Sequence, residues 1–355
     1  MLPYLSLVLA VRNERKMLPG LIDQLIEQNY PPELFEILVV DGGSTDGTAD
    51  LIRRRYSDRR VRVRVLDNPL RSVAAGRNAG IRAASGDAIM FLSGHCRIPS
   101  KNLLADTAEI LETTPAECGC LCRPQPLAGP AETHMGEAIA RARSSRIGRG
   151  PVGPGMAGYI DPPGFAGIWR RSVFEEVGFF DETFDACAGL DFNARAHQAG
   201  IRAYNDPGLA VDEQPPQKLR TLLVEMFQHG RGVSRFLRKH PECASLAEIA
   251  PLGVLLACLL ALFAWSQLPM LIAALVTLPL GLVPLAVLLT SMRIGSSFGF
   301  RNAWRAPAVF ATIYLGEGLG LLFEYAFPGD HPRKRKTAPV VTVPGLVEDA
   351  ADRAA

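Results

Sequence analysis

The sequence has little excess charge, few aromatic residues and an odd number of cysteines. Its 38 lysines and arginines nearly balance 36 aspartates and glutamates, which leaves a net charge of +2. A protein whose main role is to bind nucleic acid normally carries a strong positive excess, so we expect no nucleic-acid partner. The seven cysteines cannot all pair, and their scattered positions suit a reducing compartment. With 48% hydrophobic residues, the chain is neither disordered nor a small disulfide-stabilised domain.

Short apolar runs alternate with helical patterns over the first 212 residues. The expected strands are residues 5–11, 35–40, 61–66, 88–92, 165–169 and 201–204, and the expected helices between them include 17–27 and 74–84. This alternation predicts an α/β fold, in which helices cover both faces of a mostly parallel sheet. Ligands of such sheets bind at the carboxyl ends of the strands, which is where we look for a site.

The long apolar segments lie in the last third of the chain. No typical signal peptide opens the sequence, because the first apolar run, residues 5–11, is short and leads directly into polar residues. Residues 249–265 and 268–290, in contrast, are almost uncharged, and each is close to the length of a membrane-spanning helix. We therefore expect a transmembrane helical hairpin there.

Positive charges lie outside this hairpin on both sides. They come from Arg231, Arg235, Arg238 and Lys239 before it and from Arg293, Arg301 and Arg305 after it. Basic residues accumulate on the cytoplasmic side of membrane helices, so we expect both outer ends to be cytoplasmic. Residues 218–240 combine an apolar side with a basic side, which is typical of a helix in the membrane interface. An ordinary surface helix packed on the sheet would show the same pattern.

The predicted organisation has five parts. They are a cytoplasmic α/β domain (1–216), an amphipathic interface helix (217–245), the transmembrane hairpin (246–292), a third apolar segment (293–330) and a basic tail (331–355). Within the third segment, Glu317 and Glu324 interrupt the apolar pattern. A span there would also place the basic tail on the far side of the membrane, so we predict an interfacial or re-entrant segment. We expect the tail to be disordered.

The segment from Asp41 to Thr48 lies between an expected strand and an expected helix. Its sequence is Asp-Gly-Gly-Ser-Thr-Asp-Gly-Thr. The glycines permit a tight turn, and the backbone amides at the start of the helix suit a ligand with phosphates. The carboxylates can accept hydrogen bonds from a nucleobase or a ribose. In isolation, such residues would form only a common helix cap.

Together with this octet, two further motifs resemble family 2 glycosyltransferases: Val11-Arg12-Asn13-Glu14 after the first strand and Ala75-Gly76-Arg77-Asn78-Ala79-Gly80 before the fourth. Residues 122–126, 169–174, 177–182 and 191–195 and the trailing hydrophobic helices are similar to the succinoglycan-biosynthesis subgroup. The resemblance covers roughly residues 4–325, most of the chain.

This resemblance implies a GT-A-type fold for residues 1–216 and an inverting transfer of a sugar at the cytoplasmic face of the cell membrane. The expected partners are a UDP-type nucleotide-sugar donor, a lipid-linked saccharide or polysaccharide acceptor, and membrane lipid. Such enzymes act in exopolysaccharide and other lipid-linked glycan assembly. By the same resemblance, Asn13, Glu14 and Asp41 would line the nucleotide pocket, and Arg77 would lie near the donor.

The sequence departs from the family at the position expected to hold a metal. Ser93-Gly94-His95 stands where the family has Asp-x-Asp, or Asp-x-His in the subgroup. His95 is the candidate ligand for a divalent cation, and Mn²⁺ tolerates a histidine better than Mg²⁺, which prefers hard anionic oxygens. Two alternatives remain: Arg97 or Arg77 neutralises the leaving group without a metal, or His95 is an ordinary loop histidine.

A second departure concerns the general base. Ala188 and Gly189 replace the Glu-Asp pair whose aspartate is the base in the family, which leaves Asp191 as the candidate catalytic residue. In an extended segment Asp191 would share a face with position 189, but in a helix it would point about 200° around the axis. Alternatively, Asp191 caps the helix that carries Asn193 and Arg195.

Two functional hypotheses follow from these departures. Either the chain is a glycosyltransferase with an altered mechanism, or it is a degenerate relative that binds a nucleotide sugar or recruits partners at the membrane. Loss of a general base costs about a hundred- to ten-thousand-fold in rate. In the subgroup, a Gln-x-Gly segment faces the acceptor, so Gln228, His229, Gly230 and Arg235 are candidate contacts for a pyrophosphate, or seat the helix on anionic lipid.

Overall fold

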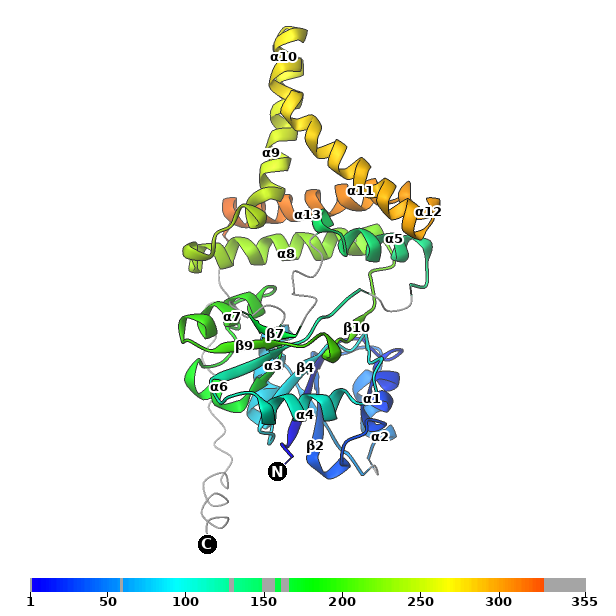
Figure 1. Cartoon of the computed structure of the whole chain (residues 1–355), viewed down its shortest axis with the longest axis vertical. Coiled ribbons are helices and arrows are strands. Elements are labelled where there is room, and N and C mark those ends of the chain that lie inside the picture. The colour runs from blue at the N-terminus through cyan, green and yellow to red at the C-terminus, as the bar shows by residue number, and fades with distance from the viewer. Residues whose placement is uncertain (1, 58–59, 128–130, 149–156, 161–165, 329–355) are drawn as a thin grey trace.

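The computed structural model describes residues 2–57, 60–127, 131–148, 157–160 and 166–328. An α/β domain forms one end of the molecule, a layer of long helices crosses it, and further helices project beyond that layer (Figure 1). The predicted basic tail, residues 331–355, lies outside the described residues.

The α/β domain is built on an eight-stranded sheet with the strand order β3-β2-β1-β4-β8-β6-β9-β7. Strands β1 to β4 run parallel to one another, whereas β8 is antiparallel to both β4 and β6. The bounds are β1 Leu5–Val11, β2 Phe35–Asp41, β3 Arg62–Asp67, β4 Ala88–Leu92, β6 Cys118–Cys122, β7 Gly158–Ile160, β8 Ala166–Arg170 and β9 Arg202–Asn205. The mostly parallel sheet predicted from the sequence is confirmed.

Helices cover both faces of this sheet, because its central strands are apolar on both sides. They are α1 Leu18–Ile26, α2 Thr48–Arg55, α3 Val73–Ala83, α4 Leu103–Thr113, α6 Arg171–Glu176 and α7 Ala188–Gln198. One core lies under α1 and α4, and a second, rich in aromatic rings, lies under α3 and α7. Close packing of α3 requires a glycine, since a Cβ at Gly80 would lie 2.3 Å from Cγ1 of Val8.

Two very short strands form a separate sheet that the sequence did not predict. β5 (Cys96–Arg97) pairs antiparallel with β10 (Asp212–Glu213), more than a hundred residues along the chain. Two residues are too few to show an alternating pattern, so only the fold reveals this pairing. Its consequence is that Glu213 lies opposite Cys96, next to the loop of His95.

The layer above the domain contains α8 (Leu219–Lys239), α13 (Ala306–Ala326) and α5 (His134–Arg143) (Figure 1). Helices α8 and α13 approach so closely that a Cβ at Gly320 would lie 2.2 Å from the carbonyl oxygen of Phe227. Protein covers Leu222, Met226, Val233 and Phe236 of α8, whereas Val224 is exposed. The amphipathic pattern that predicted a membrane face therefore serves packing against α13, α5 and the domain.

Helix α9 (Leu246–Gln267) rises from this layer on the side away from the sheet, and the chain returns through α10 (Met270–Thr277) and α11 (Leu282–Phe298) to α12 (Phe300–Ala303) (Figure 1). Over residues 268–290, where the sequence predicted the second span, the structure has α10 and most of α11, joined by a 3-10 turn at Leu278–Gly281. Two apolar helices that could form a hairpin are nevertheless present.

Two helices in the described part of the chain are long and apolar enough to cross a membrane, Leu246–Gln267 and Ala306–Ala326. They differ in their surroundings. Only 6% of the most apolar window of α9 is buried, against 50% for α13. Helix α9 exposes a row of large apolar side chains, whereas α13 uses much of its surface to pack on α8 and buries both of its glutamates.

Candidate functional site

The loops after β1 and β2 meet at the carboxyl edge of the sheet. The Asn13 side chain accepts a hydrogen bond from the backbone N–H of Thr45 (2.8 Å), and the backbone N–H of Asn13 donates to Oγ of Ser44 (2.8 Å). Asp41 accepts from the backbone N–H of Ser44 at 3.0 Å and is almost fully buried. Asn13 has a left-handed backbone with φ 58°, which asparagine tolerates better than most residues. The structure thus brings together the two predicted nucleotide loops.

Glu14 and His95 are also brought together, through a contact that the sequence analysis missed. Nδ1 of His95 lies 3.3 Å from Oε1 of Glu14, and Nε2 lies 3.1 Å from Oε1 of Glu213. Hydrogen bonds to Glu14 and to Glu213 raise the pKa of His95 to about 10. His95 is therefore a cation between two carboxylates at neutral pH.

This arrangement does not fit the divalent-cation site that was expected at His95. Both ring nitrogens face carboxylates and carry protons, so the ring offers no lone pair to a metal. Ser93 supplies a hydroxyl where a carboxylate was needed. Among the described residues, no three His, Cys, Asp or Glu side chains are placed to hold an ion together.

Arg77 lies on α3, where its guanidinium packs over the rings of Phe91 (5.4 Å) and Phe180 (5.3 Å). It makes no hydrogen bond or ion pair with any residue that the structure describes, and it is partly buried. Burial, together with the charge of Arg123, lowers its pKa to about 10. A Cβ placed on Gly189 would lie 3.7 Å from Nη1 of Arg77. Arg77 thus faces position 189, where the resemblance to the family predicts a general base.

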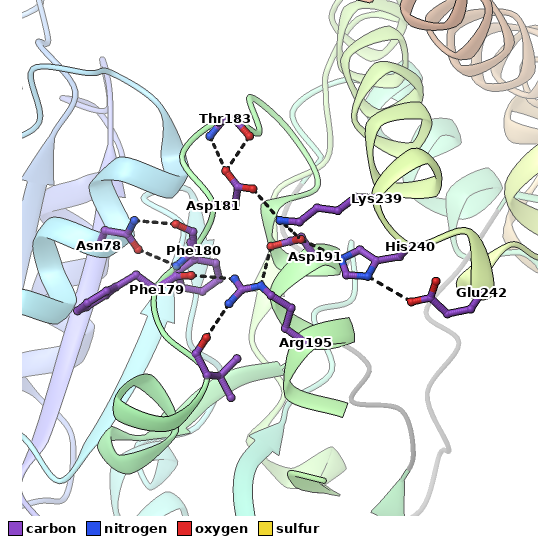
Figure 2. Close-up of polar contacts among 11 residues, drawn as sticks. Asn78, Phe179, Phe180, Asp181, Thr183, Asp191, Arg195, Lys239, His240 and Glu242 are labelled. Carbon is purple, nitrogen blue, oxygen red and sulfur yellow. Dashed lines mark hydrogen bonds and ion pairs between the residues drawn. The ribbon is translucent and has the colours of Figure 1, made fainter. Parts of the chain in front are cut away.

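Asp191, the candidate base, lies inside an ionic cluster (Figure 2). Its carboxylate is 0% exposed and pairs with Nε of Arg195 (3.0 Å), Nζ of Lys239 (2.7 Å) and Nε2 of His240 (3.0 Å). The N-cap of helix α7 is Cys187, so the prediction that Asp191 caps this helix is wrong. An acceptor hydroxyl has no access to this carboxylate, which instead ties α7 to the end of α8.

The pKa shifts in the cluster follow from these contacts. Burial raises the pKa of Asp191, but hydrogen bonds from Lys239 and His240 and the charge of Arg195 outweigh it, so the pKa is below its ordinary value. Asp181 shares Lys239 with Asp191. Against the effect of its burial, bonds from Lys239 and Thr183 lower the pKa of Asp181 to about 2. Both carboxylates are ionised at neutral pH.

His229 comes close to the start of α7. Cys187, which has a left-handed backbone with φ 63°, donates from Sγ to the backbone oxygen of His229 at 3.6 Å. On its other side, Nδ1 of His229 lies 3.0 Å from Oε1 of Glu317, a fully buried residue of α13. Burial lowers the pKa of His229, but hydrogen bonds with Cys187 and Glu317 raise it to about 10. His229 was predicted from the sequence, whereas Glu317 was seen only as an interruption.

Arg235 and its neighbours on α8 form a second ionic cluster. Glu324 of α13, 1% exposed, accepts from Arg235 (2.7 Å), Arg231 (3.0 Å) and Arg238 (3.2 Å). These contacts neutralise much of the positive charge that suggested a pyrophosphate contact for Arg235. A cavity of about 500 Å³ opens beside the cluster, lined by Asp181, Thr183, Phe184, Arg235, Arg238, Lys239 and Pro328, and the Asn13 and Asp41 loops do not border it.

Comparisons with known proteins agree with this geometry. The glycosyl transferase family 2 pattern matches residues 6–178. The succinoglycan biosynthesis protein ExoA of Rhizobium meliloti is 28% identical over 252 residues, which cover 70% of this chain and 74% of that protein. Glycosyltransferase AglE of Haloferax volcanii is 35% identical over 236 residues, which cover 65% of this chain and 73% of that protein.

A solved structure gives the same architecture. The mannosyltransferase PcManGT from Pyrobaculum calidifontis, in complex with GDP-Man and Mn²⁺, has a TM-score of 0.61 with this chain at 17% identity. The likeness covers 91% of this chain and 88% of that protein. At such low identity it shows the fold alone, which is the GT-A-type fold expected from the sequence.

Proposed function

Because the chain belongs to glycosyltransferase family 2, we propose that it transfers a sugar from a nucleotide sugar, of UDP type, to an acceptor held at a membrane. The observation that carries this proposal is the interlocked pair of loops at Asn13 and Asp41, at the carboxyl ends of β1 and β2. Parallel α/β sheets bind ligands at this edge.

The roles of the donor-side residues follow from their chemistry. Asn13, Glu14 and Asp41 are proposed to contact the nucleotide, since amide and carboxylate groups accept hydrogen bonds from base and ribose. Arg77 is proposed to lie close to the diphosphate, where a guanidinium stabilises the charge that develops as the sugar leaves. Transfer by a single displacement inverts the anomeric carbon.

Charge neutralisation of the leaving diphosphate has two candidate sources. One is a divalent cation, since PcManGT, which has the same fold, is in complex with GDP-Man and Mn²⁺. The other is cationic side chains, of which Arg77 and His95 are near the proposed donor loops. The contacts of His95 favour cationic side chains over a metal ion, because both of its ring nitrogens already face the carboxylates of Glu14 and Glu213.

Membrane attachment is supported by α9, whose apolar surface is left almost uncovered by protein. We propose that α9 and the returning helices enter the bilayer, with the domain of residues 1–216 on the cytoplasmic side. Relatives that match this chain include a succinoglycan biosynthesis protein and a dolichyl-phosphate-linked saccharide transferase of Methanococcus voltae. A lipid-linked or polysaccharide acceptor is consistent with both.

The test uses the purified full-length protein with radiolabelled nucleotide sugars and membrane lipid acceptors. We expect transfer with at least one UDP-type donor, and loss of UDP binding by calorimetry in Asp41→Ala. A variant with Ala188→Glu, Gly189→Asp and Ser93→Asp carries the family's own carboxylates and serves as the comparison. Transfer by that variant alone, with intact UDP binding by the natural chain, would establish the degenerate binding protein instead.

A further inference from the structure

We propose that the cavity at the end of α8 binds the phosphate-bearing headgroup of an anionic phospholipid that takes no part in the reaction. This inference rests on one point of the proposed function, the membrane attachment of α9. The cavity measures about 500 Å³, which is within the range of small-ligand sites and more than a single phosphate group fills. Neither Arg77 nor Gly189 lines it, and the Asn13 and Asp41 loops do not border it, so it is separate from the proposed donor site.

One wall of this cavity is cationic. Arg235, Arg238 and Lys239 all line it, and their spacing of three and four residues places them on one face of the last turn of α8. The α/β domain contributes the segment 181–184, in which Asp181 is the only carboxylate that lines the cavity. Among the described lining residues, three cations thus face one anion.

The buried carboxylate behind this wall does not neutralise it. Glu324 is shared by Arg231, Arg235 and Arg238. Asp185 adds a second carboxylate, 3.2 Å from Nη1 of Arg235, but its side chain is 66% exposed, so solvent weakens this ion pair. Three arginines therefore share two carboxylates, and the group keeps a positive charge.

Two of the lining cations have hydrogen-bond donors to spare. Arg238 is 41% exposed, and its Nη2 donates to Oε1 of Glu324 at 3.2 Å, while its other N–H groups have no partner in the described part of the chain. Nζ of Lys239 contacts Asp181 and Asp191, both at 2.7 Å, which leaves one of its three donors. A guanidinium group beside an ammonium group suits the oxygens of a phosphate.

The apolar part of the lining favours a phospholipid over a free phosphate ion. The ring of Phe184 lies 5.5 Å from Nζ of Lys239, and Pro328, which follows the end of α13, also lines the cavity. Ligand sites commonly combine apolar walls with a few charged groups that fix the orientation of the ligand. A phosphate ion has nothing to place against the apolar walls, whereas a phospholipid has a glycerol backbone and the first methylene groups of its chains.

The cavity also lies at the base of the exposed apolar helix. Helix α8 ends at Lys239, and α9 begins seven residues later at Leu246, which is 85% exposed. Helix α9 then leaves the layer on the side away from the sheet (Figure 1). With α9 in the bilayer, the end of α8 is close to the lipid headgroups. In the sequence, residues 333–336 (Arg-Lys-Arg-Lys) follow Pro328 closely, and basic clusters beside a membrane anchor are typical of proteins that bind anionic lipids.

A headgroup in this cavity gives the α/β domain a second attachment to the membrane. The lining comes both from the domain, through Asp181 and Phe184, and from the helical layer, through Arg238 and Lys239. The ligand therefore joins two parts of the chain at the membrane surface. Together with α9, this contact fixes which edge of the domain is turned towards the bilayer.

The experiment measures binding and does not depend on turnover. The full-length protein in an uncharged detergent is titrated by calorimetry with short-chain phosphatidylglycerol, with phosphatidylcholine of the same chain length, and with inorganic phosphate. We expect saturable binding of phosphatidylglycerol, no saturable binding of phosphatidylcholine, and much weaker binding of inorganic phosphate. The first comparison tests the net charge of the headgroup, and the second separates a lipid from a free phosphate.

Two substitutions in the lining should have effects of opposite sign. Arg238→Gln should weaken phosphatidylglycerol binding by about tenfold, because charge-assisted hydrogen bonds are lost. Asp181→Asn should strengthen it by about threefold, because the one carboxylate that opposes the phosphate is neutralised. Arg238→Lys keeps the charge and should retain most of the binding. The matched control is Arg220→Gln, which removes the same charge from an exposed position in the first turn of α8 and should leave binding unchanged.

Each outcome supports or overturns the site. Weaker binding in both Arg238→Gln and Asp181→Asn would show structural damage and contradict an anion site. An equal loss in Arg220→Gln would show a general attraction to basic surface and contradict a defined cavity. Inorganic phosphate that binds as tightly as phosphatidylglycerol would contradict the lipid.

Flotation with phosphatidylcholine vesicles separates this inference from the proposed function. A full-length protein that does not float with the vesicles would overturn the proposed membrane attachment. A protein that floats and binds UDP, but shows no saturable binding of phosphatidylglycerol, would overturn this inference alone.

Discussion

Two charged side chains near the first turn of α7 differ in how they are paired. Asp191 is a buried carboxylate with three cationic partners, whereas the partly buried Arg77 forms no ion pair with any residue that the structure describes. The chain thus keeps the acidic residue that holds α7 on α8 and lacks the one that would face Arg77. The difference teaches that a carboxylate in this segment can serve to hold two helices together.

The largest expected effect tests the paired side of this comparison. Asp191→Ala leaves Arg195, Lys239 and His240 without their shared anion, so we expect the free energy of unfolding to fall by about 3–5 kcal/mol. Chemical denaturation of the detergent-solubilised protein measures it. Asp67→Ala removes a surface carboxylate that is 84% exposed and paired with Arg53, and should change little. Equal losses in the free energy of unfolding would show that the buried cluster stabilises the fold no more than a surface ion pair does.

The next prediction tests the unpaired side. Arg77→Met removes a cation that forms no ion pair with any residue that the structure describes, so we expect the free energy of unfolding to change by less than about 1 kcal/mol. Transfer should nevertheless fall about a hundredfold or more, because charge stabilisation at the leaving group is lost. Arg195→Met, which removes a paired arginine, should instead destabilise the fold clearly. A large loss of stability in Arg77→Met would contradict the claim that Arg77 forms no stabilising ion pair.

A smaller effect is expected from removing divalent ions. The donor set around His95 does not fit a metal, so treatment with EDTA should leave UDP binding within about tenfold of its starting value. Calorimetry before and after dialysis, followed by addition of Mn²⁺, gives the measurement. A loss of a hundredfold that Mn²⁺ restores would show that His95 gives up its proton and binds a metal.

The smallest effect concerns the pH dependence of stability. His95 has a pKa of about 10 in the fold, above the ordinary value of 6.5, so its stabilising effect is complete below about pH 6.5 and is lost as pH rises towards 10. We expect the melting temperature to fall over this range and to fall less steeply in His95→Gln. The control is His134→Gln, at an exposed position. Parallel pH profiles for the natural chain and His95→Gln would contradict the pairing with Glu14 and Glu213.

Much of the sheet could be predicted from the sequence because its strands are continuous apolar runs. The strand expected over 88–92 agrees in full with β4, and that over 35–40 ends one residue short of β2. The two loops that are predicted to bind the nucleotide each directly follow such a strand. Local pattern was sufficient in these regions because the signal lies within a few adjacent residues.

The partners of the site residues could not be predicted in the same way. Glu213 lies 118 residues from His95, and Glu317 lies 88 residues from His229, so no local spacing connects them. The sequence predicts Asp191 as a base or a cap, but two of the cations that hold it, Lys239 and His240, come from the end of α8, a separate element. Long-range ionic contacts depend on the completed fold, and they decide which carboxylates are free to react.

The position of α9 has a consequence for how the two substrates meet. This helix leaves the α8 and α13 layer on the side opposite the sheet (Figure 1). With α9 in the bilayer, the nucleotide loops at the end of β1 and β2 are open to the aqueous phase while the start of α7 lies nearer the headgroups. Under the proposed function, the nucleotide sugar would reach the site from the aqueous phase and a lipid-linked acceptor would reach it from the bilayer.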